Sequence, residues 1–139
     1  MKGKFITFEG IDGSGKSTQL RMLADVLRAR GLDIVTTREP GGTTLGRHLR
    51  EAFLETGETV APMAELLAFA ADRAQHVEFL IKPSIAGGKI VISDRYADAT
   101  FAYQGAGREN SVEQVNQVID ACDLQRRFGI RKVWPDSPR

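Results

Sequence analysis

A glycine-rich segment at residues 10–17 limits what this chain can fold into more than any other feature. Its letters, G-I-D-G-S-G-K-S, match the pattern G-x-x-x-x-G-K-[ST] in full and follow the strand-like run 5–9, F-I-T-F-E. Residues 17–30 come next, with apolar side chains at helical spacing, and Gly31 marks their end. A strand, a loop and a helix in this order form a cradle for phosphate groups, so the sequence predicts a nucleoside triphosphate site. A chance match in a glycine-rich turn is the alternative.

Each part of the loop contributes its own chemistry. The glycines let backbone N–H groups turn inward around phosphate oxygens, the Lys16 ammonium reaches the terminal phosphates, and the Ser17 hydroxyl can ligate Mg²⁺. ATPases, GTPases and small-molecule kinases share such a loop, so it does not name a reaction. The residues expected at the triphosphate are Gly10, Ile11, Asp12, Gly13, Ser14, Gly15, Lys16, Ser17 and Thr18.

Two further polar segments each follow an apolar run. T-R-E-P-G-G at residues 37–42 ends the run 34–36, and D-R-Y-A-D-A-T-F-A-Y-Q-G at residues 94–105 follows the run 90–92. In an open parallel sheet, ligands bind at the edge formed by the carboxyl ends of the strands. We therefore expect both polar segments to lie beside the glycine-rich loop.

The periodicity along the chain predicts alternating strands and helices. Strands are expected at 5–9, 33–38 and 89–94, and helices at 17–30, 43–56, 62–86, 98–103 and 111–123. The strands are nearly all apolar inside, which is typical of a parallel sheet covered by helices on both faces. The pattern therefore indicates an α/β fold.

Four motifs in order give the chain a specific family resemblance. F-E-G-x-D-G-x-G-K-S-T, T-R-E-P-G-G, F-A-A-D-R and D-R-Y-x-D-x-T-x-A-Y-Q-G, spread over residues 4–124, resemble the thymidylate kinases, which move the γ-phosphoryl group of ATP onto dTMP. The resemblance implies a three-layer αβα P-loop kinase fold with a parallel sheet of strand order 2-3-1-4-5, here truncated to about three strands. Another nucleoside or nucleotide kinase of the same superfamily is the alternative.

The resemblance also implies roles for single residues. Lys16, Asp94 and Arg95 would be catalytic, and Asp94 with Ser17 would hold Mg²⁺, in part through water. Arg95 and Arg50 would reach the phosphate of dTMP, since guanidinium forks suit phosphate. The residues expected at dTMP are Asp12, Arg38, Glu39, Arg50, Phe69, Arg73, Arg95, Thr100, Tyr103 and Gln104.

The sugar and the base would be held by different side chains. The resemblance assigns Asp12 to the sugar 3′-hydroxyl and places Tyr103 with Gln104 on the sugar side. Phe69 would stack on thymine, with Arg73 and Thr100 at the edge of that ring. Two alternatives remain open from the residues themselves. Phe69 lies in the run L-L-A-F-A-A and can be a core residue, and Asp94 with Arg95 can be a surface ion pair.

The chain changes character after Leu124. Residues 1–123 carry 14 basic and 17 acidic side chains, whereas residues 124–139 carry five basic and one acidic. We expect an N-terminal part of a P-loop kinase domain at 1–124 and an atypical basic tail at 125–139, as a shifted reading frame or a broken gene would produce. A basic tail that binds an acidic partner is the alternative.

This departure bears on activity and on folding. In the family, the chain would continue into a fourth strand and a lid that carries an arginine. Some members instead carry an arginine in the loop, at the position where this chain has Gly13. A cation on the migrating phosphoryl group contributes about 10³–10⁵ in rate, so a catalytically impaired nucleotide-binding fragment is the alternative function. Without a fourth strand, the strand 5–9 would be an exposed sheet edge.

The composition mainly argues against other functions and other types of site. The net charge of +1 and the absence of interleaved aromatic and basic residues argue against an ATPase that acts on nucleic acid. The single Cys122 cannot form an internal disulfide, and His48 and His76 are too isolated to suggest a zinc site. No leader-like segment opens the chain and no apolar run approaches ~20 residues, so we expect a cytoplasmic protein without membrane contact.

The helix expected at 62–86 has ample apolar surface for a partner, and it belongs to the group of helices near 43–86. The resemblance implies that they form a homodimer interface, whereas helices that simply face the core are the alternative.

Overall fold

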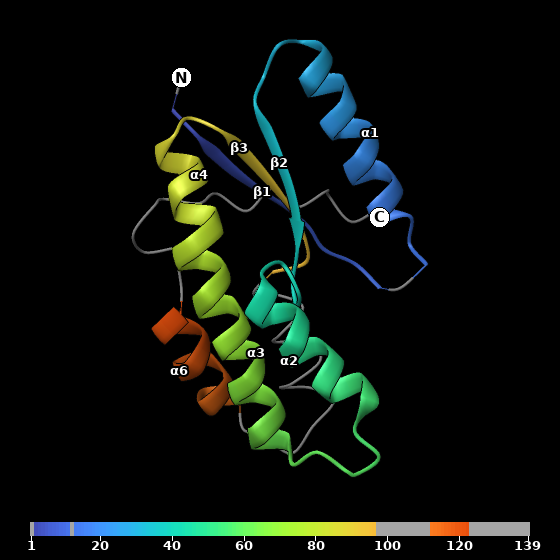
Figure 1. The fold of residues 1–139 in the computed structure, drawn as a ribbon, viewed down its shortest axis with the longest axis vertical. Coiled ribbons are helices and arrows are strands. Elements are labelled where there is room, and N and C mark those ends of the chain that lie inside the picture. Colours follow the sequence, from blue (N-terminus) through green and yellow to red (C-terminus); the bar gives the residue numbers. More distant parts are fainter. Residues whose placement is uncertain (1, 12, 97–111, 123–139) are drawn as a thin grey trace.

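Three parallel strands form the centre of the molecule. The computed structural model describes residues 2–11, 13–96 and 112–122 (Figure 1). Strands β1 (Lys4–Phe8), β3 (Ile90–Asp94) and β2 (Ile34–Arg38) pair in the order β1-β3-β2. Ile90 is in register with Lys4 on one side and with Ile34 on the other. The expected strands and the 2-3-1 part of the expected order are confirmed.

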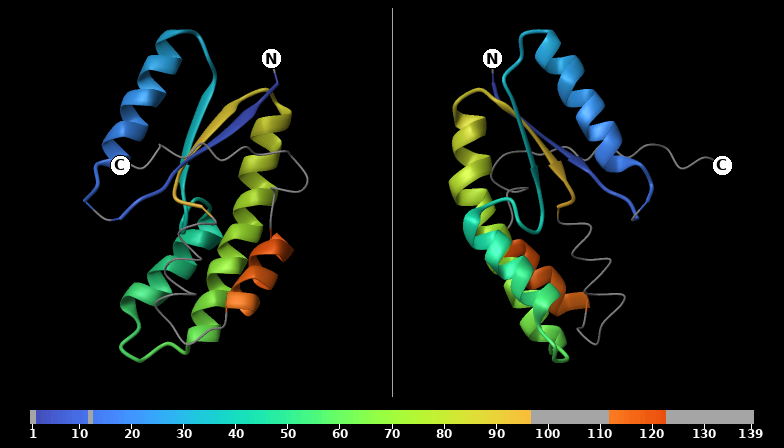
Figure 2. Two further views of the ribbon diagram at one scale, coloured as in Figure 1. Left: turned by 180° about the vertical axis from the view of Figure 1, so that it is seen from behind. Right: turned by 45° about the vertical axis from the view of Figure 1, so that its right-hand side comes forward.

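Helices cover both faces of this sheet, as Figures 1 and 2 show. Helix α1 (Lys16–Ala29) packs on one face, where its Leu20 and Ala24 form a buried cluster with Ile34, Ile90 and Ile92. The other face carries Val91, which packs against Val77, Ile81 and Tyr96. Successive side chains of β3 thus enter opposite cores, because side chains alternate along a strand. The predicted α/β fold with a parallel sheet is confirmed.

A group of helices continues beyond the carboxyl ends of the strands (Figure 1). Helix α2 (Thr44–Glu55) and helix α6 (Val112–Cys122) both pack on helix α3 (Pro62–His76). Thr43 begins α2, because its hydroxyl oxygen accepts a hydrogen bond from Gly46 N at 3.0 Å. These helices place side chains next to the strand ends.

The helix expected at 62–86 is right in extent and wrong in geometry. Helix α3 leads into a π-helical turn, η1 (Val77–Ile81), and then into helix α4 (Lys82–Ala86). Pro83 explains the change, because its ring lacks an N–H and would clash with the carbonyl of Phe79 in a regular α-helix. The wide turn instead lets Lys82 N donate to Val77 O, five residues earlier.

The predicted helix at 98–103 and the basic tail at 125–139 lie outside the described residues. Where the structure does describe the chain, it contains no helix that is both long and apolar enough to cross a membrane.

Candidate nucleotide site

The three polar segments of the sequence start from one edge of the sheet. Hydrogen bonds extend the ladder past the last residue of each strand: Glu39 N donates to Asp94 O at 3.0 Å, and Arg95 N donates to Phe8 O at 2.9 Å. The residues after β1, β2 and β3 therefore start from neighbouring points. The expectation from the strand ends is confirmed for residues 37–42 and 94–96, and residues 97–105 of the second polar segment lie outside the described residues.

The segment of residues 10–18, here called the phosphate loop, depends on left-handed backbone conformations. Gly13 and Gly15 have φ angles of 78° and 84°, and a Cβ atom at either position would meet nothing within 4 Å. The backbone conformation, and not crowding, therefore requires glycine. Gly15 caps α1, whose first N–H groups face the loop. Asp12 lies outside the described residues.

Asp94 joins the phosphate loop to the end of β3. Its Oδ2 accepts a hydrogen bond of 2.7 Å from Ser17 Oγ, and its Oδ1 lies 3.9 Å from Lys16 Nζ. Oδ1 is buried and accepts no hydrogen bond within the described part of the chain. A carboxylate oxygen in this position, beside a hydroxyl, fits a hard divalent cation such as Mg²⁺.

The described residues contain no cluster of three or more histidine, cysteine or carboxylate side chains that could enclose a metal ion. This does not exclude Mg²⁺, which is commonly bound by one or two protein oxygens together with water and substrate phosphates. Ser17 and Asp94 fit that type of incomplete protein site.

A groove of about 580 Å³ opens beside these two residues. Its walls come from α1, β2, the turn after β2, η1 and the end of β3. The residues that line it are Ser17, Leu20, Arg21, Thr36, Thr37, Arg38, Gly41, Gly42, Leu80 and Asp94.

Three arginines bring positive charge to this sheet edge. Burial lowers the pKa of Arg50, and the nearby guanidinium groups of Arg38 and Arg95 lower it further. Gly41, with φ 103°, separates two of them: a Cβ atom there would lie 3.3 Å from Arg50 Cδ and 3.6 Å from Arg38 Nε. Cations held this close together repel one another, so an anion between them is stabilising.

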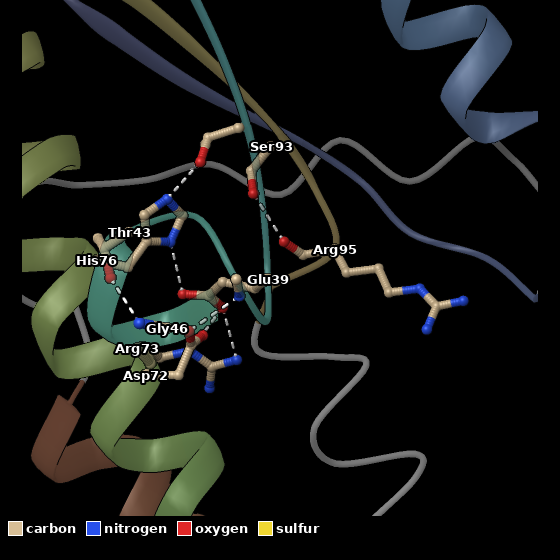
Figure 3. Close-up of polar contacts among 10 residues, drawn as sticks. Glu39, Thr43, Gly46, Asp72, Arg73, His76, Ser93 and Arg95 are labelled. Atoms are coloured by element: carbon tan, nitrogen blue, oxygen red, sulfur yellow. Dashed lines mark hydrogen bonds and ion pairs between the residues drawn. The ribbon is translucent and has the colours of Figure 1, made fainter. Parts of the chain in front are cut away.

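Arg95 has an unusual backbone. Its φ angle of 72° is in the left-handed region, which costs about 1–3 kcal/mol for a residue other than glycine. The Ser93 hydroxyl stabilises this turn by donating to Arg95 O at 2.9 Å. Figure 3 shows that the Arg95 side chain consequently points away from Glu39.

Behind the strand ends lies a group of five side chains, here called the buried polar cluster: Thr37, Glu39, Asp72, Arg73 and His76 (Figure 3). Arg73 donates from Nε and from a terminal nitrogen to Glu39 Oε2, at 3.0 and 2.9 Å. His76 Nδ1 donates to Glu39 Oε1 at 3.0 Å, and His76 Nε2 lies 2.7 Å from Thr37 Oγ1. Both carboxylate oxygens of Glu39 are therefore engaged, and one face of Arg73 stacks on Tyr96, 4.6 Å from the ring centroid.

Asp72 connects the cluster to the turn after β2. Its Oδ1 accepts a hydrogen bond of 2.9 Å from Gly41 N, and a Cβ atom at Gly46 would overlap that oxygen. Burial raises the pKa of Asp72, and the negative charge of Glu39 adds to the rise, against the opposing effects of the Gly41 N–H, His76 and Arg73.

The sequence predicted only part of this cluster. Glu39 and Arg73 were expected at dTMP, whereas Asp72 had no expected role and His76 was weighed only as a metal ligand. One signal was available: Asp72, Arg73 and His76 follow one another as D-R-x-x-H, which places them on adjoining positions of a helix. Sequence alone does not tell whether such a face meets water or protein.

Phe69 lies on α3 with its ring parallel to that of Phe53, at 5.9 Å between centroids and 4° between planes. It is half-buried, so it is neither a fully buried core residue nor a fully exposed one. Its expected partners Thr100, Tyr103 and Gln104 lie outside the described residues.

Known proteins are similar to this chain in sequence and in fold. A sequence model of the thymidylate kinase family matches residues 8–122. The thymidylate kinase of Halothermothrix orenii is 48% identical over 98% of this chain and 62% of its own length, and that of Nostoc punctiforme is 50% identical over 85% and 57%. The crystal structure of thymidylate kinase from Ehrlichia chaffeensis superposes with a TM-score of 0.81 at 41% identity, over 98% of this chain and 74% of that one.

The chain thus spans about three fifths of the length of these two curated relatives. The family match covers the phosphate loop, both polar segments and the helices that carry Arg50 and Arg73. The chain belongs to the thymidylate kinase family.

Proposed function

We propose that this chain serves the transfer of the γ-phosphoryl group of ATP to dTMP, which gives dTDP and ADP. One observation carries the proposal: the phosphate loop and the group of three arginines lie at the same sheet edge. Asp94 lies there as well, at the end of the central strand β3, which pairs with both β1 and β2. A kinase needs two such anion sites facing each other, one for the donor and one for the acceptor.

On the donor side, the phosphate loop and the start of α1 would bind the phosphates of ATP. The Ser17 hydroxyl donates a hydrogen bond to Asp94 and so keeps its oxygen lone pairs available for Mg²⁺. When bound, Mg²⁺ would neutralise charge on the β- and γ-phosphate oxygens. Lys16 would place its ammonium on the terminal phosphates.

On the acceptor side, Arg38, Arg50 and Arg95 would bind the dTMP phosphate, which relieves the repulsion between their own charges. The base and the sugar would contact Phe69 and Arg73, with Asp12, Thr100, Tyr103 and Gln104 as further expected contacts. Phosphoryl transfer depends mainly on positioning and on electrostatic stabilisation, and the strained backbone of Arg95 supports such a positioned cation.

Nucleotide binding to the chain tests this proposal. We expect dTMP to raise the melting temperature more than dCMP, dGMP or UMP at equal concentration, because a ligand that binds only the native state stabilises it. Equal stabilisation by all four nucleotides would contradict the proposed acceptor. Formation of ADP that depends on dTMP would separate an active kinase from a nucleotide-binding fragment.

The proposal includes a homodimer and a cytoplasmic location. Exposed apolar side chains on α2, α3 and η1 support a second copy as partner: Leu45, Leu54, Met63, Leu67 and Phe79. We expect Leu67→Asp to lower the mass measured by sedimentation equilibrium from dimer to monomer. Met22→Asp, at an exposed position on α1, is the matched control and should leave the mass unchanged.

A further inference from the structure

We propose that His76 is a positioning residue that fixes Arg73 through Glu39. The inference rests on the proposed function in one respect, the assignment of Arg73 to the thymine edge. Arg73 and Glu39 are almost fully buried, with side-chain exposures of 5% and 4%, and His76 is completely buried. A buried histidine between a carboxylate and a hydroxyl has a fixed ring orientation and a fixed tautomer.

The tautomer follows from the partners of the ring. A carboxylate can only accept, so Nδ1 carries a proton and donates to Glu39 Oε1 at 3.0 Å. Nε2 lies 2.7 Å from the Thr37 hydroxyl, which comes from β2. The ring therefore connects α3 to the end of β2 at both of its nitrogens.

The effect on Arg73 comes through the second carboxylate oxygen. Arg73 donates twice to Glu39 Oε2 and stacks on Tyr96, so the rotation of the carboxylate contributes to the direction of its guanidinium plane. His76 holds Oε1 and thereby prevents that rotation. Without this hydrogen bond, only Oε2 of Glu39 is held by a hydrogen bond, and the orientation of Arg73 that its proposed contact with thymine requires is less firmly fixed.

The space around His76 is consistent with a fixed position of its ring. A Cβ atom at Gly42 would lie 2.6 Å from Thr37 Oγ1 and 2.7 Å from His76 Nε2. The glycine of the turn after β2 thus leaves room for the contact between Thr37 and His76. The same turn holds Gly41, which donates to Asp72 one helical turn before His76.

Two substitutions separate positioning from simple packing. His76→Asn places an amide nitrogen where Nδ1 was and keeps a donor for Glu39, whereas His76→Gln places its amide near Nε2 and keeps only the contact to Thr37. We expect His76→Gln to weaken dTMP binding about tenfold in calorimetry, and His76→Asn to stay within about threefold of the original chain. Thr37→Val, which removes only the Nε2 contact, should behave like His76→Asn.

A measurement without ligand keeps this test independent of the proposed function. In ¹H–¹⁵N spectra of the ligand-free chain, we expect solvent exchange of the Arg73 Nε–H to be about tenfold faster in His76→Gln than in His76→Asn. If the original chain does not bind dTMP, the proposed acceptor is wrong, while this exchange measurement still tests the positioning role. Equal exchange in the two variants would overturn the inference, and so would equal dTMP affinity of the two variants when the original chain binds dTMP.

Discussion

The phosphate loop and the buried polar cluster lie at the same end of the sheet, but they are built in opposite ways. The loop consists of consecutive residues, most of them exposed, and its shape comes from glycine backbone conformations. The cluster gathers side chains from β2, the turn after it and α3, all half-buried or buried, and its shape comes from hydrogen bonds between them.

This difference separates two tasks. A backbone cradle can hold the phosphates of any nucleotide, because every nucleoside triphosphate presents the same oxygens. A network of buried side chains is specific, because each group needs a partner in one direction and loses stability without it. Changes in the loop should therefore affect binding, and changes in the cluster should affect stability as well.

The largest effect is expected from removing the acceptor at the centre of the cluster. Glu39→Ala leaves the buried Arg73 and His76 without their shared partner, and breaking a buried ion pair costs about 3–5 kcal/mol of unfolding free energy. Chemical denaturation monitored by circular dichroism measures this loss. A variant as stable as the original chain would show that the cluster does not contribute to folding.

Lys16→Ala should reverse this pattern by weakening binding and leaving the fold intact. Loss of a charge-assisted contact to phosphate corresponds to about 1.5–3 kcal/mol, or roughly 10- to 100-fold in the dissociation constant of ATP with Mg²⁺. Calorimetry with ATP and, in a separate titration, with dTMP checks this, since dTMP affinity should hardly change. Equal losses for both nucleotides would mean that the two anion sites are not distinct.

Gly46→Ala tests the packing between α2 and the cluster. The new methyl group would overlap Asp72 Oδ1, and overpacking of this kind costs about 1–3 kcal/mol. Gly57→Ala is the matched control, because nothing lies within 4 Å of its Cβ position. Thermal melting of the two variants should differ by several degrees, and identical melting temperatures would argue against a rigid Asp72.

The smallest effect concerns the pH dependence of Asp72. Its pKa is raised in the folded state, so the folded chain binds this proton more tightly than the unfolded chain does. The resulting stabilisation is complete below the ordinary aspartate pKa and is lost as the pH rises through the raised value. Asp72→Asn should flatten that part of the curve of melting temperature against pH, and an unchanged slope would assign it to another group.

The same contrast explains what could be predicted from the sequence. The phosphate loop and the strands before Arg38 and Asp94 are recognisable because their signals are local: a glycine pattern and short apolar runs. Asp72 and His76 carry no local signal of burial, since polar residues on a helix usually face water. Their partners Gly41 and Thr37 are more than 30 residues away, so only the folded chain shows the contacts.

Two further details depend on tertiary packing in the same way. Phe69 belongs to an apolar run that fits a core or a binding site equally well, and its parallel neighbour Phe53 is on another helix. The π-helical turn had one visible cause, Pro83, but helical periodicity alone predicts an uninterrupted helix.

The π-helical turn changes the directions in which side chains point along the continuous helical segment 62–86. Arg73, Val77 and Ile81 follow at intervals of four residues, and all three are buried. In a regular α-helix each such interval advances the side chain by about 40° around the axis, so a row of this kind drifts away from one direction. The π-helical turn reduces this rotation of side-chain direction. Arg73, which contacts Glu39, and Ile81, which packs against the sheet, therefore stay on the same side of the helix. Inserting or deleting one residue within Val77–Ile81 would therefore rotate the two ends against each other, even if every helical hydrogen bond re-formed.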